Sequence, residues 1–168
     1  MWRREWTIDN EFPQMDNEFP QITNNNANNK SKLLEAELCY KIQGAVYNVT
    51  NKYGSGLKEQ IYQKALVEEF IKQNLQFEQQ KRIIIYSLDS GKSLGVYVPD
   101  FIIENKVILE IKASNITTRQ DINQQRSYLR ASIYEIGYLV NFGTPKLDIR
   151  RSIYTNNRKS FIVKIIRD

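Results

Sequence analysis

Apolar residues recur every three to four positions after residue 32 of this chain, which predicts an amphipathic helix over residues 33–52. The positions with this spacing are Leu34, Leu38, Ile42, Val46 and Val49. The sequence Gly54-Ser55-Gly56 ends the helix, because consecutive small residues favour a turn. A second helix is predicted over residues 57–74.

Runs rich in β-branched and aromatic residues follow the second helix. They predict strands over about 76–87, 93–97, 100–104 and 106–113. A third helix, capped by Thr or Asn, is predicted from Thr117 or Thr118 to about Ala131, and a short strand over 136–142. Residues 147–154 and 160–166 are expected to be edge strands, or a strand and an arm. The predicted fold class is α/β (α+β), with helices flanking a small mixed sheet.

The sequence PDFIIENKVILEIK, residues 99–112, predicts a β-hairpin with a polar connection at 104–106. With the turn centred on Asn105, residues whose numbers sum to 210 lie opposite each other. Asp100 then faces Glu110, with Cβ atoms roughly 4.5 to 5.5 Å apart. This prediction depends on the register, because a slip of one residue would exchange the two faces of the strand.

Glu110 and Lys112 interrupt a strand that is otherwise apolar. Since strand side chains alternate, both point to one face while Leu109 and Ile111 point to the other. Burying a carboxylate and an ammonium group is costly unless they pair or meet a metal ion. A structural ion network would explain these charges, and so would metal-dependent cleavage of phosphodiester bonds.

The composition removes most other chemistries. The 168 residues are 41% hydrophobic, which suits one domain with a substantial core. With no histidine and one cysteine, Cys39, the chain cannot form a Ser/His/Asp triad, a zinc site, an iron–sulfur cluster or an internal disulfide. No long apolar run suggests a signal peptide or a membrane span, and we expect a cytoplasmic protein.

Charge is distributed unevenly along the chain. Residues 1–30 carry three basic and five acidic side chains, a net charge of −2, which leaves +7 for the other residues out of a total of +5. A basic domain suits a phosphate backbone as partner, and it equally suits an ordinary soluble surface.

The first thirty residues also differ from the rest in composition. They contain the tandem heptapeptides DNEFPQM and DNEFPQI, followed by an Asn-rich stretch. Two copies are too few for a solenoid, and this composition cannot bury a core. We therefore expect residues 1–30 to be a disordered or loosely packed, dispensable extension and residues 31–168 to form a single domain.

Two helical segments carry further polar residues of interest. Glu59 is predicted in the first turn of the second helix, where the helix dipole favours a carboxylate, and Tyr62 on a neighbouring face. Glu59 is explained equally well as a solvated acid or as a site residue. The third helix carries a polar stripe, which is either an ordinary surface or the face that contacts the sheet edge with Asp100, Glu110 and Lys112. Arginines near this stripe could bind phosphates. The stripe is Gln120, Gln124 and Tyr128, and the arginines are Arg119, Arg126 and Arg130.

Taken together, these segments resemble the GxxExxY group of the PD-(D/E)XK nuclease superfamily. The resemblance covers about 44–152, and its motifs occur in order along the chain. They are GLKEQIY at 56–62, PD at 99–100, EIK at 110–112, QxxxY at 124–128 and LVNFG at 139–143. The resemblance implies a restriction-endonuclease-like αβββαβ core.

The resemblance also implies a role for each catalytic residue. Asp100 and Glu110 would bind the metal ion, and Lys112 would assist the attacking water. Glu59 would join the metal shell, and Gln124 would orient substrate or water.

A hard cation, Mg²⁺ or Mn²⁺, suits this set, since Mg²⁺ keeps several waters and takes one or two carboxylates from the protein. The expected metal ligands are Asp100, Glu110, the Ile111 carbonyl oxygen and Glu59. The expected substrate-binding residues are Tyr62, Tyr128, Arg119 and Arg126.

The sequence thus predicts a Mg²⁺-dependent nuclease, with DNA favoured over RNA as the nucleic-acid partner. The alternative is a catalytically silent module on the same fold that binds nucleic acid or protein. The intact set of Asp100, Glu110 and Lys112 favours the nuclease, because a binding module has no need of a costly charge cluster. The oligomeric state is left open, with a dimer as one option.

Overall fold

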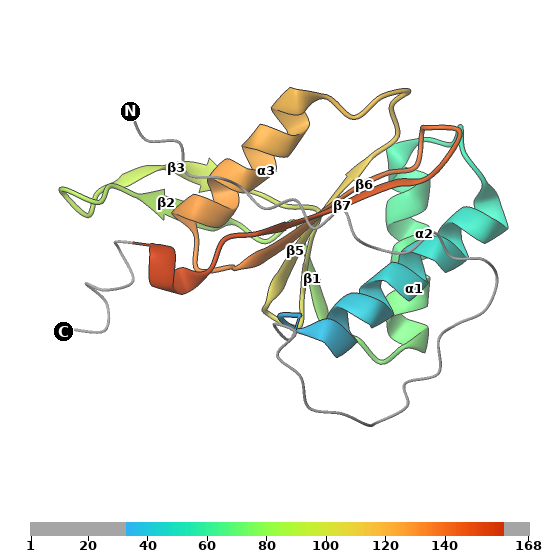
Figure 1. The fold of residues 1–168 in the computed structure, drawn as a ribbon, viewed down its shortest axis with the longest axis horizontal. Coiled ribbons are helices and arrows are strands. Elements are labelled where there is room, and N and C mark those ends of the chain that lie inside the picture. The colour runs from blue at the N-terminus through green and yellow to red at the C-terminus, as the bar shows by residue number, and fades with distance from the viewer. Residues whose placement is uncertain (1–32, 160–168) are drawn as a thin grey trace.

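The computed structural model describes residues 33–159. A central sheet lies between two helices on one side and a helix with a small hairpin on the other (Figure 1). The extension predicted at residues 1–30 and the strand or arm predicted at 160–166 lie outside the described residues.

The central sheet has five strands in the order β1-β4-β5-β6-β7. β5 and β6 are parallel, and the other neighbouring pairs are antiparallel. The strands are β1 (Phe77–Gln79), β4 (Phe101–Ile103), β5 (Val107–Lys112), β6 (Ile136–Asn141) and β7 (Asp148–Ile153). β2 (Ile83–Tyr86) and β3 (Ser93–Tyr97) form a separate two-stranded hairpin.

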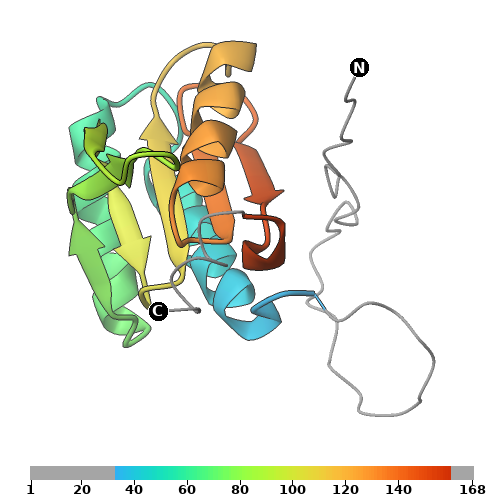
Figure 2. The same cartoon turned by 90° about the vertical axis from the view of Figure 1, so that its left-hand side faces the viewer.

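Helices cover both faces of this sheet. α1 (Ala36–Tyr53) and α2 (Glu59–Lys72) lie on one face, and α3 (Arg119–Ala131) lies on the other with the β2–β3 hairpin (Figure 2). α3 is the crossover that joins the parallel strands β5 and β6. In chain order, the main sheet and its helices run from a helix to β1, β4 and β5, and then to α3 and β6. This is the predicted αβββαβ order, and it confirms the predicted fold class. Within residues 33–159 no helix is long and apolar enough to cross a membrane.

The structure confirms the first two predicted helices, with slightly shorter bounds. Leu38, Ile42, Val46 and Val49 are all buried on one side of α1, as the spacing predicted. Each fully buried side chain of this size contributes roughly 1.5 to 3 kcal/mol. Gly54, with a φ of 63°, ends α1 in a conformation that favours glycine.

The β4–β5 hairpin has the predicted register. Phe101 pairs with Leu109 and Ile103 with Val107, so the paired numbers sum to 210. The turn is tight, because Glu104 and Asn105 both have positive φ values, 51° and 52°, as a type I′ turn requires. Asp100 and Glu110 are the next residues of the two strands in this register.

The continuous strand predicted over 76–87 is wrong. The chain forms β1 in the main sheet, turns at Gln80 with a φ of 49°, and enters β2 of the separate hairpin. The Gln80 N–H donates to the Asp100 carbonyl at 3.1 Å, which is the last bond before the chain leaves the main sheet. The polar sequence from Glu78 to Arg82 marks this turn.

Apolar cores fill both sides of the sheet. Val107, Leu109 and Ile111 of β5 are buried against α1 and α2. Ile108 belongs to the second core, under α3 and the hairpin, together with Tyr97. Glu110 and Lys112 lie on the same face as Ile108, so the predicted alternation of β5 is confirmed and brings both charges to one side of the sheet.

Candidate active site

Asp100 is fixed at the start of β4 by hydrogen bonds to both carboxylate oxygens. Its Oδ2 accepts from the Ile111 main-chain N–H at 2.7 Å, and its Oδ1 accepts from Gln63 Nε2 at 2.8 Å. Gln63 lies on α2, one turn after Glu59. The carboxylate is therefore held between the sheet and α2, with a defined orientation.

Glu110 lies beside Asp100 on β5 and is held from the opposite side of the site. The Tyr97 hydroxyl of β3 donates to Glu110 Oε1. Burial, followed by the charge of Glu110, raises the pKa of Tyr97 well above its ordinary value, so this hydroxyl remains a donor. The Tyr97 ring stacks on Tyr128 of α3, with centroids 3.5 Å apart and an interplanar angle of 7°.

The electrostatics of the two carboxyl groups favour a cation. Burial raises the pKa of Asp100, although the hydrogen bond from the Ile111 N–H opposes the effect. Burial raises the pKa of Glu110 to about 7, and the Asp100 carboxylate adds to the rise. The Lys112 ammonium group lowers both pKa values but does not outweigh burial. A positive charge between these groups would stabilise their ionised forms.

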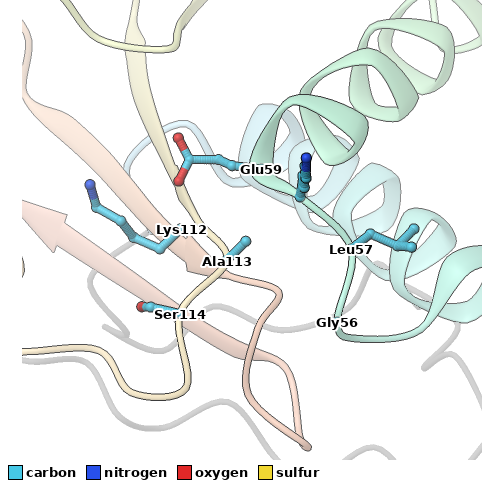
Figure 3. A pocket seen from close by; sticks show the side chains of 7 residues that line it. Gly56, Leu57, Glu59, Lys112, Ala113 and Ser114 are labelled. Atoms are coloured by element: carbon cyan, nitrogen blue, oxygen red, sulfur yellow. The ribbon is translucent and has the colours of Figure 1, made fainter.

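Glu59 and Lys112 both line a cavity of about 460 Å³ (Figure 3). One wall is the turn into α2, residues 56–59, and the other is the end of β5 and the residues after it, 112–114. Burial raises the pKa of Glu59 and the Asp100 carboxylate raises it further, while Lys112 lowers it. The pKa of Glu59 therefore responds to the charges of both Asp100 and Lys112.

The donor set fits a hard cation that keeps part of its water. Within residues 33–159, no group of three or more His, Cys, Asp or Glu side chains could hold a metal ion by itself. Two carboxylates, one main-chain oxygen and several waters are nevertheless the ligands that Mg²⁺ commonly takes. The Ile111 N–H donates to Asp100, and because the N–H and C=O of one extended residue point to the same side, the Ile111 carbonyl oxygen also lies toward Asp100. Asp100, Glu110 and Ile111 would hold the ion, with Glu59 at the edge of the shell.

The structure gives Tyr62 a different position from the one expected. Its side chain is fully buried and stacks on Phe142, with ring centroids 4.4 Å apart. Its hydroxyl donates to the Gly54 carbonyl at 2.8 Å and accepts from the Leu57 N–H at 3.2 Å. A substrate-binding role for Tyr62 is therefore wrong, because neither its ring nor its hydroxyl faces the cavity.

The other expected residues lie on α3. Gln124 is exposed, whereas the two carboxylates take their side-chain hydrogen bonds from Gln63 and Tyr97. The neighbouring Gln125 is the glutamine that α3 buries, beside Gly137 of β6. A role for Gln124 toward substrate or water therefore stays a prediction.

The expected substrate contacts on α3 differ in exposure. Arg119, the first residue of the helix, is exposed, and Arg126 is half-buried. Burial, followed by the charge of Arg150, lowers the pKa of Arg126. Tyr128 is half-buried and supports Tyr97 through its stacked ring. The structure therefore leaves Arg119 as the most accessible of these side chains.

Sequence reasoning missed Gln63 and Tyr97, which bond directly to the two carboxylates. A signal was present for Gln63, because it follows Glu59 by four residues and so lies on the same helix face. Tyr97 precedes Asp100 by three residues and is the one buried residue of β3, whose other residues are all exposed. Neither signal identifies a bonding partner by itself.

Comparison with known proteins gave one match. A family model described as the PD-(D/E)XK nuclease superfamily matches residues 36–152. This range contains α1 through β6 and most of β7, together with Asp100, Glu110, Lys112 and Glu59. Comparison with curated proteins and with solved structures found no match.

Proposed function

Because the chain belongs to the PD-(D/E)XK nuclease superfamily, we propose that it is a Mg²⁺-dependent nuclease that hydrolyses phosphodiester bonds of DNA. The observation that carries the proposal is the convergence of Asp100, Glu110 and Lys112 at one end of β5, with both carboxyl pKa values raised by burial. The motif GLKEQIY, residues 56–62, further supports membership of the GxxExxY group within the superfamily.

Asp100, Glu110 and the Ile111 carbonyl would hold Mg²⁺, or Mn²⁺ in its place. When bound, the ion lowers the pKa of a water ligand and offsets charge on the phosphate oxygens. The Lys112 ammonium group would orient and polarise the attacking water. Gln63 and Tyr97 keep the two carboxylates in position, so that the ligand geometry exists before substrate arrives.

The charge of the cavity suits a nucleic-acid phosphate. Lys58 and Lys112 line its two walls, and Arg119 lies at the start of α3, six residues after Ala113. Residues beyond the first thirty carry a net charge of +7, from the −2 of residues 1–30 and the total of +5. A positive surface around the reacting bond steers a polyanion toward the site.

A cleavage assay tests the proposal. Plasmid, linear duplex, single-stranded DNA and RNA are incubated with the protein in Mg²⁺, in Mn²⁺ and in EDTA. We expect cleavage of DNA with either metal, none in EDTA, and a loss of about a hundredfold or more in Asp100→Asn and Lys112→Ala. Lys64→Ala removes an equal charge from an exposed position on α2 and should cleave normally.

Each outcome of the assay bears on the proposal. Cleavage that persists in both site variants would assign the activity to a contaminant or another site, and would overturn it. Binding of DNA without any cleavage would favour the silent binding module on this fold.

A further inference from the structure

The two walls of the cavity come from distant parts of the chain, residues 56–59 and 112–114, yet their spacing decides where Glu59 lies relative to Lys112. We propose that Asn141 and Phe142, at the end of β6, are positioning residues that fix one wall each. This inference rests on the proposed function, because it concerns the same site, but its structural part can be tested without any activity.

Asn141 fixes the wall that follows β5. It is fully buried and lies beside Lys112 in the parallel pairing of β5 with β6. Its Oδ1 accepts from the main-chain N–H groups of Ser114 at 3.2 Å and Gly143 at 2.9 Å. Its Nδ2 donates to Ser114 Oγ at 3.3 Å and Thr117 Oγ1 at 3.2 Å. These four bonds use both donors and both acceptor sites of the amide, so its orientation is fixed.

The close approach of Gly143 to this wall supports the same role. A Cβ at Gly143 would lie 2.4 Å from the main-chain carbon of Ala113 and 2.5 Å from Ser114 N. The Phe142 N–H also donates to the Lys112 carbonyl at 2.8 Å. The backbone after β6 therefore packs directly against the residues that carry Lys112 into the cavity.

Phe142 fixes the opposite wall through Tyr62. The two buried rings stack with an interplanar angle of 9°, and the Tyr62 hydroxyl bonds to both Gly54 and Leu57. Those bonds hold the turn that leads into α2, and Glu59 begins that helix. The position of Glu59 thus depends on the ring of Phe142, although the two side chains are far apart in sequence.

One dipeptide can reach both walls because successive side chains of an extended chain point to opposite faces. The Asn141 side chain bonds to the loop that leads to α3, and the Phe142 side chain packs in the core under α2. The spacing of the walls is then set by the end of β6, the strand next to β5. This gives the sequence LVNFG, residues 139–143, a role in the site without contact with substrate.

Two variants test this inference wall by wall. Asn141→Ala removes the bonds to Ser114, and Phe142→Leu removes the ring that stacks on Tyr62 while keeping an apolar side chain in the core. Amide hydrogen exchange should become faster at Ser114 only in the first variant and at Leu57 only in the second. If both amides keep wild-type exchange rates, or both become faster in both variants, the proposed division into walls is wrong.

Kinetics give the second readout. In both variants we expect kcat to fall about a hundredfold with KM for DNA unchanged, because misplaced catalytic groups lose reactivity more than affinity. Val46→Ala removes core packing in α1 without removing a hydrogen bond of either wall, and should leave kcat unchanged at temperatures where the protein is folded. Wild-type kcat in both site variants would overturn the positioning role.

The two readouts separate this inference from the proposed function. If the unaltered protein cleaves nothing, the proposed function fails, and the exchange rates alone decide whether Asn141 and Phe142 fix the walls. If the unaltered protein cleaves DNA and the variants cleave equally well, the proposed function stands and the positioning role fails.

Discussion

Among single residues, Asp100 and Glu110 lower the stability of the folded state when they are ionised. Burial raises the pKa of both carboxyl groups, and that of Glu110 reaches about 7. An acid whose pKa is higher in the folded state destabilises that state as pH rises above the ordinary pKa, and the penalty is complete above the raised pKa. The protein thus keeps two charges that reduce its own stability, which is characteristic of residues that serve a site.

Glu110→Gln should therefore stabilise the metal-free protein. Below its ordinary pKa of 4.5, Glu110 is protonated in both states, so the penalty is absent. As pH rises from 4.5 to about 7, the unfolded chain loses its proton first and stability falls. Since one pKa unit equals about 1.4 kcal/mol, the rise from 4.5 to about 7 corresponds to roughly 3 kcal/mol, and the free energy of unfolding should rise by about this amount at about pH 8. Urea denaturation in EDTA measures this.

The control for this prediction is Glu68→Gln, which removes an exposed acid from α2 and should change stability little. The gain in Glu110→Gln should shrink at about pH 5, where less of the penalty is present. A variant that is less stable than the original protein at about pH 8 would contradict the argument.

The sequence located Asp100, Glu110 and Lys112 because a short polar turn fixes the register of a hairpin, and the register fixes which side chains meet. Gln63 and Tyr97 could not be assigned, since their bonds join α2 and β3 to the sheet, and such contacts depend on packing between distant segments.

At the scale of whole elements, a buried acid joins α1 to α2. Glu69 of α2 accepts hydrogen bonds from Lys52 of α1, from Asn48 of α1 at 3.0 Å and from Lys72 of its own helix at 3.0 Å. The hydrogen bond from Lys52, more than the others, lowers the pKa of Glu69 to about 2. This cluster holds the helix that carries Glu59 and Gln63, so it supports the site from a distance.

Glu69→Gln should weaken the fold and its resistance to acid. A carboxylate with a lowered pKa stabilises the folded state above its ordinary pKa of 4.5, and this contribution disappears as pH falls toward about 2. At neutral pH the variant should lose on the order of 2 kcal/mol, since charged hydrogen bonds are replaced by neutral ones. Between pH 4.5 and 2 its stability should fall less steeply than that of the original protein.

Urea denaturation at a series of pH values gives this comparison. Glu37→Gln is the matched control, because Glu37 pairs with Lys41 on the exposed surface of α1 and such pairs contribute little. Equal acid sensitivity of the Glu69 variant and the original protein would show that the cluster does not couple the two helices.

Element boundaries were predictable wherever periodicity and capping agree. α3 begins after Thr118, whose Oγ1 accepts from the Asp121 N–H at 3.1 Å while Asp121 accepts from the Thr118 N–H at 2.9 Å. This reciprocal cap is a local signal, and the predicted start was right. The split between β1 and β2 was missed because both segments are β-prone, and the sheet that each joins depends on its partner strand, not on local pattern.

On the scale of the whole molecule, charge separates the chain into two parts. Residues 1–30 carry a net charge of −2 and the remaining residues carry +7, from the total of +5. The match to the superfamily begins at residue 36, after the acidic part. All residues assigned to the site therefore lie in the basic part, where a polyanion is attracted.

A variant that begins at residue 31 should therefore keep its fold and its cleavage rate, while its affinity for DNA rises. Removing a net charge of −2 raises the total from +5 to +7. The gain in affinity should be clear at low salt and should vanish near 0.5 M salt, where charges more than about 4 Å apart are screened. Fluorescence anisotropy with a labelled duplex in Ca²⁺ or EDTA, across a salt series, measures binding without cleavage. A gain that persists at high salt would point to a specific contact of the acidic segment, and a loss of cleavage would show that the extension is part of the enzyme.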